Sequence, residues 1–218
     1  MANFDVDSSD YSDTLQRTLA NPVIVRLNSA LQHRVPSDAP SRPESKLAAV
    51  LALVRMTGER EANAELLFIK RATLTGDPWS GHIAFPGGRH DLLDDSLADT
   101  ALRETREELT LDVARHGKLI GRLDDLAPQT PSLPPIIIRP FVGVVPAAVC
   151  ITPNDEVAEA FWVSVAALRL RAARKEHAVT RNHQTMLFPS YRIREHVIWG
   201  LTERIVSQLL PLFGGAND

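Results

Sequence analysis

The chain has little of several features, and each shortage excludes a class of protein. It contains one cysteine, Cys150, so it cannot form an internal disulfide and suits a reducing compartment. No apolar run approaches the roughly 20 residues that span a bilayer, and the amino terminus lacks the basic start and apolar core of a secretory signal. We therefore expect a cytoplasmic protein without membrane association, in which Cys150 is buried as a small apolar residue.

The net charge and the composition further limit the class of protein. The net charge of −3 leaves no basic excess for a surface that binds a nucleic-acid polymer, so we expect none as a partner. A hydrophobic content of 44% and a charged content of 23% are typical of a globular protein. A length of 218 residues is enough for one good-sized core and short for two.

Residues 1–45 are predicted to form an arm, followed by the main domain at residues 46–218. Apolar residues recur at roughly helical spacing between Asp13 and Val35, and Pro22 interrupts them, which predicts two short helices. A segment rich in proline and serine follows and has the composition of a linker. The arm could pack against a second subunit, which would give a homodimer, or cover its own core.

Beyond the arm, the sequence predicts intermixed strands and helices. Strands are predicted at residues 47–56, 65–70, 82–85, 118–123, 136–145 and 157–163, and a hairpin at 178–181 and 185–188. Helices are predicted from about Ser96, a good N-cap, to Leu109, and over residues 195–212. Because these elements share one core and no internal repeat is present, we expect an α/β/α sandwich on a mixed β-sheet.

The most informative segment is a glycine turn followed by a charged helix. A glycine pair comes at residues 87–88, and the sequence Arg-Glu-Thr-Arg-Glu-Glu-Leu occupies residues 103–109. At about 100° per residue, Glu104, Glu107 and Glu108 fall on one face of the helix. Three carboxylates this close suit a hard divalent cation, Mg²⁺ or Mn²⁺, whose usual companions are substrate phosphates.

An acidic run on a helix is, taken alone, more often a solvated face than a site. The glycine pair changes this interpretation, because a tight turn there folds the acidic loop back over the start of the helix. Asp94 would then meet Arg103, which would be neutralised and would hold the loop in place. The two features together predict a functional site.

At these residues the chain resembles the Nudix hydrolases, whose signature is Gly-x5-Glu-x7-Arg-Glu-x-x-Glu-Glu-x-Gly followed by an apolar residue. The matching residues are Gly88, Arg103, Glu104, Glu107, Glu108 and Leu111. Asp94 replaces the first glutamate and lies one residue farther from Arg103, a variant similar to the coenzyme A diphosphatase branch. Thr110 replaces the closing glycine, so the helix should end differently or with strain.

The resemblance covers roughly residues 45–212 and implies a Nudix-type sandwich that hydrolyses a small-molecule diphosphate with the help of a metal. Coenzyme A or a derivative is the first substrate it implies. The alternatives are ADP-ribose, nucleoside diphosphate sugars, dinucleoside polyphosphates and oxidised nucleotides. The coenzyme A branch usually has an arginine in the loop where this chain has Gly-Asp-Pro-Trp-Ser at residues 76–80. A non-catalytic, nucleotide-sensing module is a further alternative, which the complete set of signature carboxylates disfavours.

The resemblance also implies a role for each signature residue. Glu107 and Glu108 would be the first metal ligands. Glu104 would be a further ligand, or would orient Glu108 or the attacking water. The backbone carbonyl of Gly88, or of the glycine before it, would complete the coordination shell. Arg103 would be structural, tied to the acidic loop.

The general base and the substrate contacts lie outside the signature. Glu156, at the entrance to a strand, is the candidate base, and an exposed carboxylate beside a turn is the alternative. The candidate substrate contacts are Arg71, His82, Arg89 and Trp79. For the arginines the alternative is a solvated surface side chain, and for the histidine it is a hydrogen-bonded structural residue. Trp79 lies in a loop of glycine, aspartate and proline, where its ring could touch the substrate.

Overall fold

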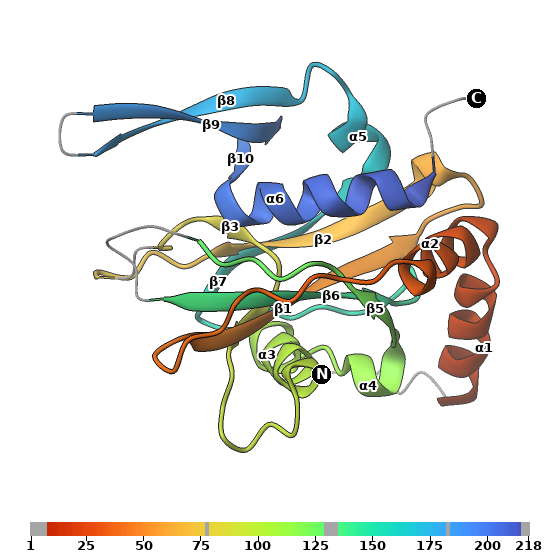
Figure 1. Ribbon diagram of the computed structural model, residues 1–218. Coiled ribbons are helices and arrows are strands. Elements are labelled where there is room, and N and C mark those ends of the chain that lie inside the picture. Colours follow the sequence, from red (N-terminus) through yellow and green to blue (C-terminus); the bar gives the residue numbers. More distant parts are fainter. Residues whose placement is uncertain (1–7, 77–78, 129–134, 182–183, 215–218) are drawn as a thin grey trace.

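A mixed seven-stranded sheet forms the centre of the molecule, as the computed structural model describes it for residues 8–76, 79–128, 135–181 and 184–214 (Figure 1). The strands are β1 (Lys46–Met56), β2 (Ala64–Arg71), β3 (Ile83–Ala84), β4 (Gly87–Arg89), β5 (Lys118–Arg122), β6 (Ile136–Val144) and β7 (Val157–Ser164). Their order is β3-β2-β1-β6-β5, with β4 paired to β1 and β7 paired to β2. Strands β1 and β6 are parallel, and the other pairs are antiparallel.

Helices cover the sheet, and a second, smaller sheet lies beside it. The α-helices are α1 (Ser8–Leu19), α2 (Pro22–His33), α3 (Leu97–Leu109), α4 (Val113–His116), α5 (Val165–Arg169) and α6 (Gly200–Leu209). Two 3-10 turns are η1 (Glu61–Asn63) and η2 (Leu210–Phe213). The small sheet has the order β10-β9-β8, formed by β8 (Arg174–Arg181), β9 (Gln184–Ile193) and β10 (His196–Trp199).

The two faces of the main sheet bury two separate cores. Successive side chains of a strand point to opposite faces, so Leu51 and Leu53 of β1 pack on the side of α3, whereas Ala52 and Val54 pack on the side of α2 and α6. All four side chains are fully buried. Figure 1 shows α3 and α6 on opposite sides of the sheet. The α/β/α sandwich predicted from the sequence is therefore confirmed.

The amino-terminal arm forms two helices that break at the predicted proline. Pro22 begins α2, and the Asn21 side chain caps the helix by accepting a hydrogen bond from the Val23 N–H at 2.9 Å. Leu27 and Leu31 of α2 are buried in the same core as the apolar face of α6. Helix α2 therefore covers the core of its own chain, and packing of the arm on a second subunit stays a prediction. The division of the chain at residues 45 and 46 stays a prediction.

Two sequence predictions are wrong. The helix expected over residues 195–212 begins only at Gly200, because residues 196–199 form β10 and pair with Ser190–Ile193 of β9. Cys150 is exposed instead of buried, since it lies in the connection between β6 and β7, after the chain has left the sheet. Strand β4 was not predicted, because its Gly-Gly-Arg sequence has little preference for a strand.

No helix among the described residues combines the length and the apolar content that a membrane crossing requires.

The packing of α2 predicts a large difference between two of its residues. Leu27→Ala should lower the free energy of unfolding by about 2–5 kcal/mol, because Leu27 is 0% exposed and its loss leaves a cavity. Val25→Ala on the same helix is the control, because Val25 is 51% exposed, and it should change stability by less than about 0.5 kcal/mol. Urea unfolding monitored by tryptophan fluorescence measures both. Equal, small effects would mean that α2 is not part of the cooperative core.

Candidate active site

The acidic helix α3 has both ends fixed by its own sequence. The Ser96 hydroxyl caps the first turn by accepting a hydrogen bond from the Asp99 N–H at 3.3 Å. At the other end Thr110 adopts the left-handed conformation, with φ of 54°, which is rare for a β-branched residue. The strain expected where threonine replaces glycine is thus present. The Thr110 hydroxyl donates to the Thr152 carbonyl at 3.1 Å, which helps to offset it.

The glycine pair brings the β4 backbone directly against the carboxylates of α3. Gly87 has φ of +149°, and a Cβ there would lie 2.2 Å from the Ala49 carbonyl oxygen. A Cβ at Gly88 would lie 2.4 Å from the carboxyl carbon of Glu104. The Gly87 N–H donates to Glu108 Oε2 at 2.9 Å. A side chain at either glycine would force the helix and the strand apart.

Arg103 is the centre of the charged network. Its Nε and Nη2 donate to the two oxygens of Asp94 at 2.8 and 2.9 Å, the forked geometry that suits a carboxylate. Its Nη1 donates to Glu104 Oε1 and to Glu107 Oε2, both at 3.0 Å. Nη2 also donates to the Arg89 carbonyl at 3.1 Å. One guanidinium therefore ties the loop after β4 to two of the acidic side chains of α3, and the predicted contact with Asp94 is present.

Asp94 is a buried anchor for the loop. Its side chain is 5% exposed, and besides Arg103 it accepts hydrogen bonds from the Asp91 N–H at 3.0 Å and the Thr100 hydroxyl at 2.8 Å. The hydrogen bonds from Arg103 hold the pKa of Asp94 well below its usual range, against the opposing effect of burial. The carboxylate thus stays charged in the folded protein across the whole neutral and mildly acidic range.

Glu108, in contrast to Asp94, lies in surroundings that raise the pKa of its carboxylate. Its side chain is 3% exposed, and this burial raises its pKa to about 8. The Gly87 N–H and Arg71, whose Nη1 lies 4.0 Å from Glu108 Oε1, lower the pKa in part, whereas the charges of Glu104 and Glu156 raise it further. Burial also raises the pKa of Glu104. Glu104 and Glu108 thus both lie in surroundings that disfavour the charged form of a carboxylate.

The residues present suit a divalent cation. Glu104, Glu107 and Glu108 offer hard oxygen donors, and their side chains are 17%, 51% and 3% exposed, so the group runs from the interior to the surface. The glycine at residue 88 keeps the backbone close to Glu104, in space that a Cβ would fill. A positive ion would offset the burial of the Glu104 and Glu108 carboxylates, which raises the pKa of both. The assignment of individual ligands stays a prediction.

Glu156 lies within electrostatic range of this group. Its negative charge contributes to the raised pKa of both Glu104 and Glu108. The backbone fixes its place, because the Glu156 carbonyl accepts a hydrogen bond from the Ala72 N–H at 2.8 Å and the Asn154 N–H donates to the Glu108 carbonyl at 2.8 Å. The structure thus brings the candidate base close to the acidic helix, although it does not test its role.

The four predicted substrate contacts lie in different surroundings. Arg71 ends β2 and approaches Glu108, as described above. The Arg89 side chain is exposed, and its carbonyl binds Arg103. The His82 ring lies against Trp199 of β10, with ring centroids 5.0 Å apart. Trp79 is partly buried in the loop before β3, and its carbonyl accepts a hydrogen bond from the His82 N–H.

Sequence reasoning missed one part of the network. Thr100 is fully buried, donates to Asp94 and also bonds the His90 ring, whose Nδ1 lies 2.9 Å from the Thr100 hydroxyl oxygen. The sequence contained a signal for this contact, because Thr100 comes three residues before Arg103 and so shares its helix face.

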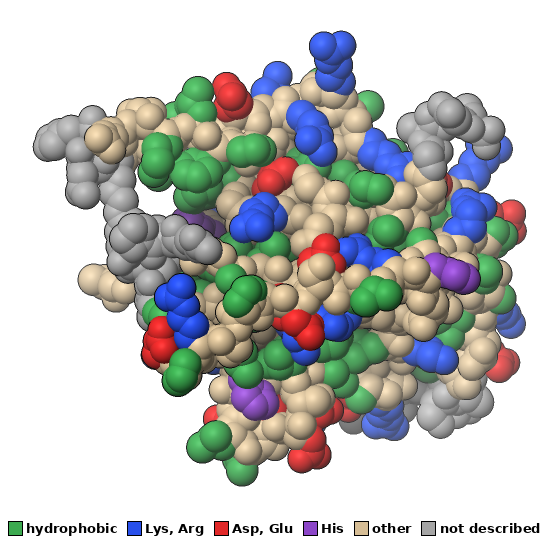
Figure 2. All heavy atoms as spheres, viewed as in Figure 1, with side chains coloured by type: hydrophobic (Ala, Val, Ile, Leu, Met, Phe, Trp, Pro, Cys, Tyr) green, Lys and Arg blue, Asp and Glu red, His purple; other side chains and the backbone are tan. Residues whose placement is uncertain are grey.

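Figure 2 shows acidic and hydrophobic side chains over the lower end of the molecule, where the loop between β4 and α3 lies in Figure 1.

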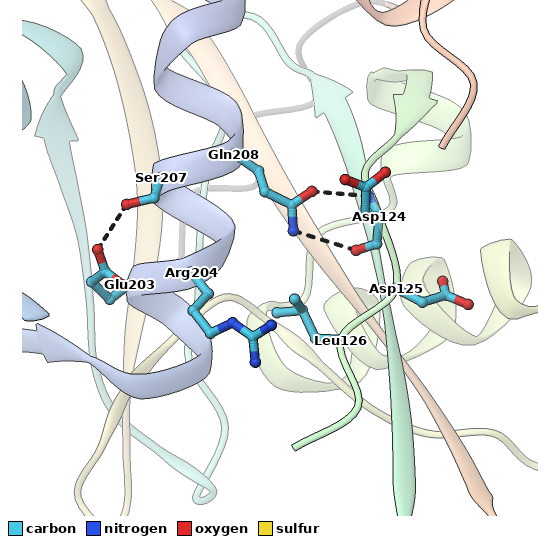
Figure 3. A pocket seen from close by; sticks show the side chains of 7 residues that line it. All are labelled: Asp124, Asp125, Leu126, Glu203, Arg204, Ser207 and Gln208. Carbon is cyan, nitrogen blue, oxygen red and sulfur yellow. Dashed lines mark hydrogen bonds between the residues drawn. The ribbon is translucent and has the colours of Figure 1, made fainter. Parts of the chain in front are cut away.

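A separate hollow of about 350 Å³ lies between α6 and the segment after β5 (Figure 3). It is lined by Asp124, Asp125, Leu126, Glu203, Arg204, Ser207 and Gln208. Gln208 binds the Asp124 backbone through both ends of its amide, and the Ser207 hydroxyl donates to Glu203 at 2.7 Å. None of the residues that line this hollow is a predicted site residue, so we do not assign the chemistry to it.

A mixed sheet between helices, with the Arg-Glu-x-x-Glu-Glu helix packed under a double glycine, is the arrangement expected of a Nudix domain. The sequence model of the NUDIX domain matches residues 45–183. The chain belongs to the Nudix family of hydrolases.

Two proteins are similar to this chain in sequence, and one solved structure is similar to it in fold. The chain is 34% identical to the Nudix hydrolase NudL of Photorhabdus laumondii over 144 residues, which are 66% of this chain and 74% of NudL. It is 32% identical to the human mitochondrial coenzyme A diphosphatase NUDT8 over 185 residues, which are 82% of this chain and 75% of that protein. A MutT/nudix family protein from Enterococcus faecalis has a similar fold, with a TM-score of 0.52 and 16% identity, over 95% of this chain and 73% of that one.

The Asp94–Arg103 pair predicts a specific loss of stability in acid. Because the pKa of Asp94 is lowered on folding, the pair stabilises the fold above the unfolded pKa of about 3.9, and this contribution is lost as the pH falls below it. Asp94→Asn should therefore cost about 2–3 kcal/mol at pH 7 and less at pH 3. Urea midpoints measured between pH 7 and pH 3 test this.

Asp95→Asn is the matched control for this measurement. Asp95 is the exposed neighbour of Asp94 and has no ion pair among the described residues. It should change neither the midpoint at pH 7 nor its pH dependence by more than the experimental error. A pH dependence of Asp94→Asn as steep as that of the wild type would contradict the assignment.

Proposed function

We propose that this Nudix hydrolase cleaves the diphosphate of coenzyme A or a close derivative, with Mg²⁺ or Mn²⁺ as its cation. The observation that carries the proposal is Glu108, a carboxylate that is 3% exposed, bonded to the Gly87 N–H and flanked by Glu104 and Glu107. A group of this kind is stable in its charged form when a cation binds to it. The likeness to a named coenzyme A diphosphatase over 82% of this chain supports the substrate class.

The roles proposed for the side chains are those that the resemblance to the Nudix hydrolases implies. Glu107 and Glu108 hold the cation, Glu104 binds or orients beside them, and the Gly88 carbonyl completes the shell. When bound, the cation neutralises the phosphate oxygens and acidifies a water molecule. Arg103 keeps the carboxylates in register without touching the substrate.

The proposed reaction is the attack of water on one phosphorus of the anhydride. Glu156 takes a proton from the attacking water, a new bond forms between the water oxygen and phosphorus, and the anhydride P–O bond breaks. The products are two phosphate monoesters, which for coenzyme A are 4′-phosphopantetheine and adenosine 3′,5′-bisphosphate. We propose that Arg71, whose Nη1 lies 4.0 Å from Glu108 Oε1, neutralises a diphosphate oxygen.

The remaining substrate contacts decide which diphosphate is preferred. Arg89 is exposed next to the glycine pair, and Trp79 and His82 lie on the loop that leads to β3. That loop has no arginine in residues 76–80, which favours a second candidate, a substrate without a 3′-phosphate such as ADP-ribose. Residues 77–78 lie outside the described residues. We also propose that the partner of this protein is its small-molecule substrate and that the protein is cytoplasmic.

Removal of one charged ligand should abolish most of the activity. Glu107→Gln keeps the shape of a half-exposed side chain and removes its charge, so kcat/KM in Mg²⁺ should fall by about 100-fold or more. Glu59→Gln, an exposed glutamate outside the site, is the control and should keep full activity. Phosphate-monoester products resolved by chromatography provide the measurement. Full turnover by both Glu107→Gln and Glu108→Gln would show that the ligand assignment is wrong.

A panel of three substrates separates the two candidate functions. Coenzyme A, 3′-dephospho-coenzyme A and ADP-ribose share a diphosphate and an adenosine, but only the first carries the 3′-phosphate. The proposal expects the highest kcat/KM for one of the two coenzyme A forms. A preference for ADP-ribose over both would replace it by the second candidate. Hydrolysis of none of the three, nor of an oxidised nucleotide, would support a non-catalytic module.

The candidate base gives a further test. Glu156→Gln should lower kcat by about 100-fold, with little change in KM, because general-base catalysis acts in the transition state. Asp155→Asn, its exposed neighbour, should leave both constants unchanged. If the two variants behave alike, the base is another group.

A further inference from the structure

A second group of metal-ligating side chains lies on the face of the sheet opposite to α3. Glu159 of β7, Glu195 of the β9–β10 turn and His196 at the start of β10 bring two carboxylate oxygens and one imidazole nitrogen within 4.8 Å of one another. Glu159 shares a strand face with Phe161, which packs in the core covered by α6. The sheet therefore separates this group from the acidic helix.

His196 is buried, and its ring faces both carboxylates. The residue is 6% exposed, and its Nε2 lies within ion-pair distance of both Glu159 and Glu195. Its ring stacks on Phe161, with centroids 4.0 Å apart and planes 14° from parallel, so its orientation is fixed. Its Nε2 points at the two carboxylates.

The distances suit an ion between the groups better than a direct hydrogen bond. Nε2 lies 3.5 Å from Glu159 Oε1 and 3.6 Å from Glu195 Oε1, whereas an N–H···O bond spans about 2.7–3.2 Å. Two ligand atoms at about 2.0–2.2 Å from a tetrahedral ion are about 3.4 Å apart. In the described part of the chain, no lysine or arginine lies within 4.0 Å of either carboxylate.

We propose that Glu159, Glu195 and His196 form a second cation site, which takes a divalent transition-metal ion of the zinc class. An imidazole nitrogen with two carboxylates favours such an ion over Mg²⁺, which prefers oxygen ligands and water. The glutamate side chains are 44% and 73% exposed, so the ion can enter from solvent. Three protein ligands leave one tetrahedral position for water.

The expected effect of this ion is structural. Glu159 belongs to the strand that pairs with β2, Glu195 to the turn that joins β9 to β10, and His196 to the start of β10. The ion would link β7 of the main sheet to the start of β10 in the small sheet. Strand β10 directly precedes α6 in the chain. The inference does not depend on the proposed function, because its ligands are distinct from those of α3.

Zinc binding by the metal-free full chain tests the site. Calorimetry with ZnCl₂ is carried out on the wild type, on Glu104→Gln/Glu107→Gln and on Glu159→Gln/Glu195→Gln. The wild type and the first variant should both bind Zn²⁺ at the second site, and saturation should raise Tm by about 5–10 °C. The Glu159→Gln/Glu195→Gln variant should lose this binding and the Tm shift, although it folds, because both substituted side chains are solvent-accessible.

Cobalt and magnesium add readouts that do not depend on activity. Co²⁺ should give the visible absorption of a four- or five-coordinate site in the wild type and in Glu104→Gln/Glu107→Gln, but not in Glu159→Gln/Glu195→Gln. Millimolar Mg²⁺ should not displace it. Glu44→Gln/Glu59→Gln, a pair of exposed glutamates elsewhere, is the control and should bind as the wild type does.

Three results would overturn the second site. The first is zinc binding by Glu159→Gln/Glu195→Gln with unchanged affinity and Tm shift. The second is loss of all zinc binding in Glu104→Gln/Glu107→Gln. The third is no zinc binding by the wild type or by any variant, which would leave the group as a histidine–glutamate ion pair. Diphosphate hydrolysis in Mg²⁺ is followed in parallel, and its absence in every variant would contradict the proposed function without affecting the zinc result.

Discussion

The guanidinium of Arg103 is the interaction on which the site depends. It joins Asp94 of the loop after β4 to Glu104 and Glu107 of α3, and it also binds the Arg89 backbone. Four acidic or carbonyl groups are thereby arranged around one fixed positive charge. Without it, the loop would lose its anchor, and the carboxylates of α3 would repel one another with nothing between them. The charge that organises the site comes from the protein, so the acidic helix can form before any cation binds.

Steric fit and charge act together at the glycine pair. Strand β4 pairs with Ala48–Val50 of β1, and the absence of a Cβ at Gly88 allows Glu104 to lie against it. The same approach buries Glu108 and gives it the Gly87 N–H as a partner. Burial that raises the pKa of a carboxylate is unfavourable for the isolated fold, since it disfavours the charged form. The protein accepts this cost at a position where a bound cation would remove it, a pattern expected of a functional site.

The sequence predicted the features that depend on local spacing. The limits of α3 and the Asp94–Arg103 contact follow from helical periodicity and from the glycine turn. Features that depend on partners distant in sequence were not predicted. Val197, Ile198 and Trp199 were assigned to a helix because only β9 makes them a strand, and β4 exists because β1 offers it an edge. Cys150 was expected to be buried because composition favours burial, but its position in a connection decides otherwise. The proximity of Glu156 to α3 depends on backbone bonds that no motif encodes.

Those backbone bonds make one part of the β6–β7 connection intolerant to changes in length. The Thr152 N–H donates to the Leu109 carbonyl, and the Asn154 N–H donates to the Glu108 carbonyl. These two bonds to the end of α3 thus fix the positions of the residues from Thr152 to Glu156. An insertion beside the exposed Ala148 would lengthen the connection ahead of these bonds and leave Glu156 in place. A single residue added between Thr152 and Glu156 would shift the carboxylate out of reach, so diversification of this connection is confined to its first half.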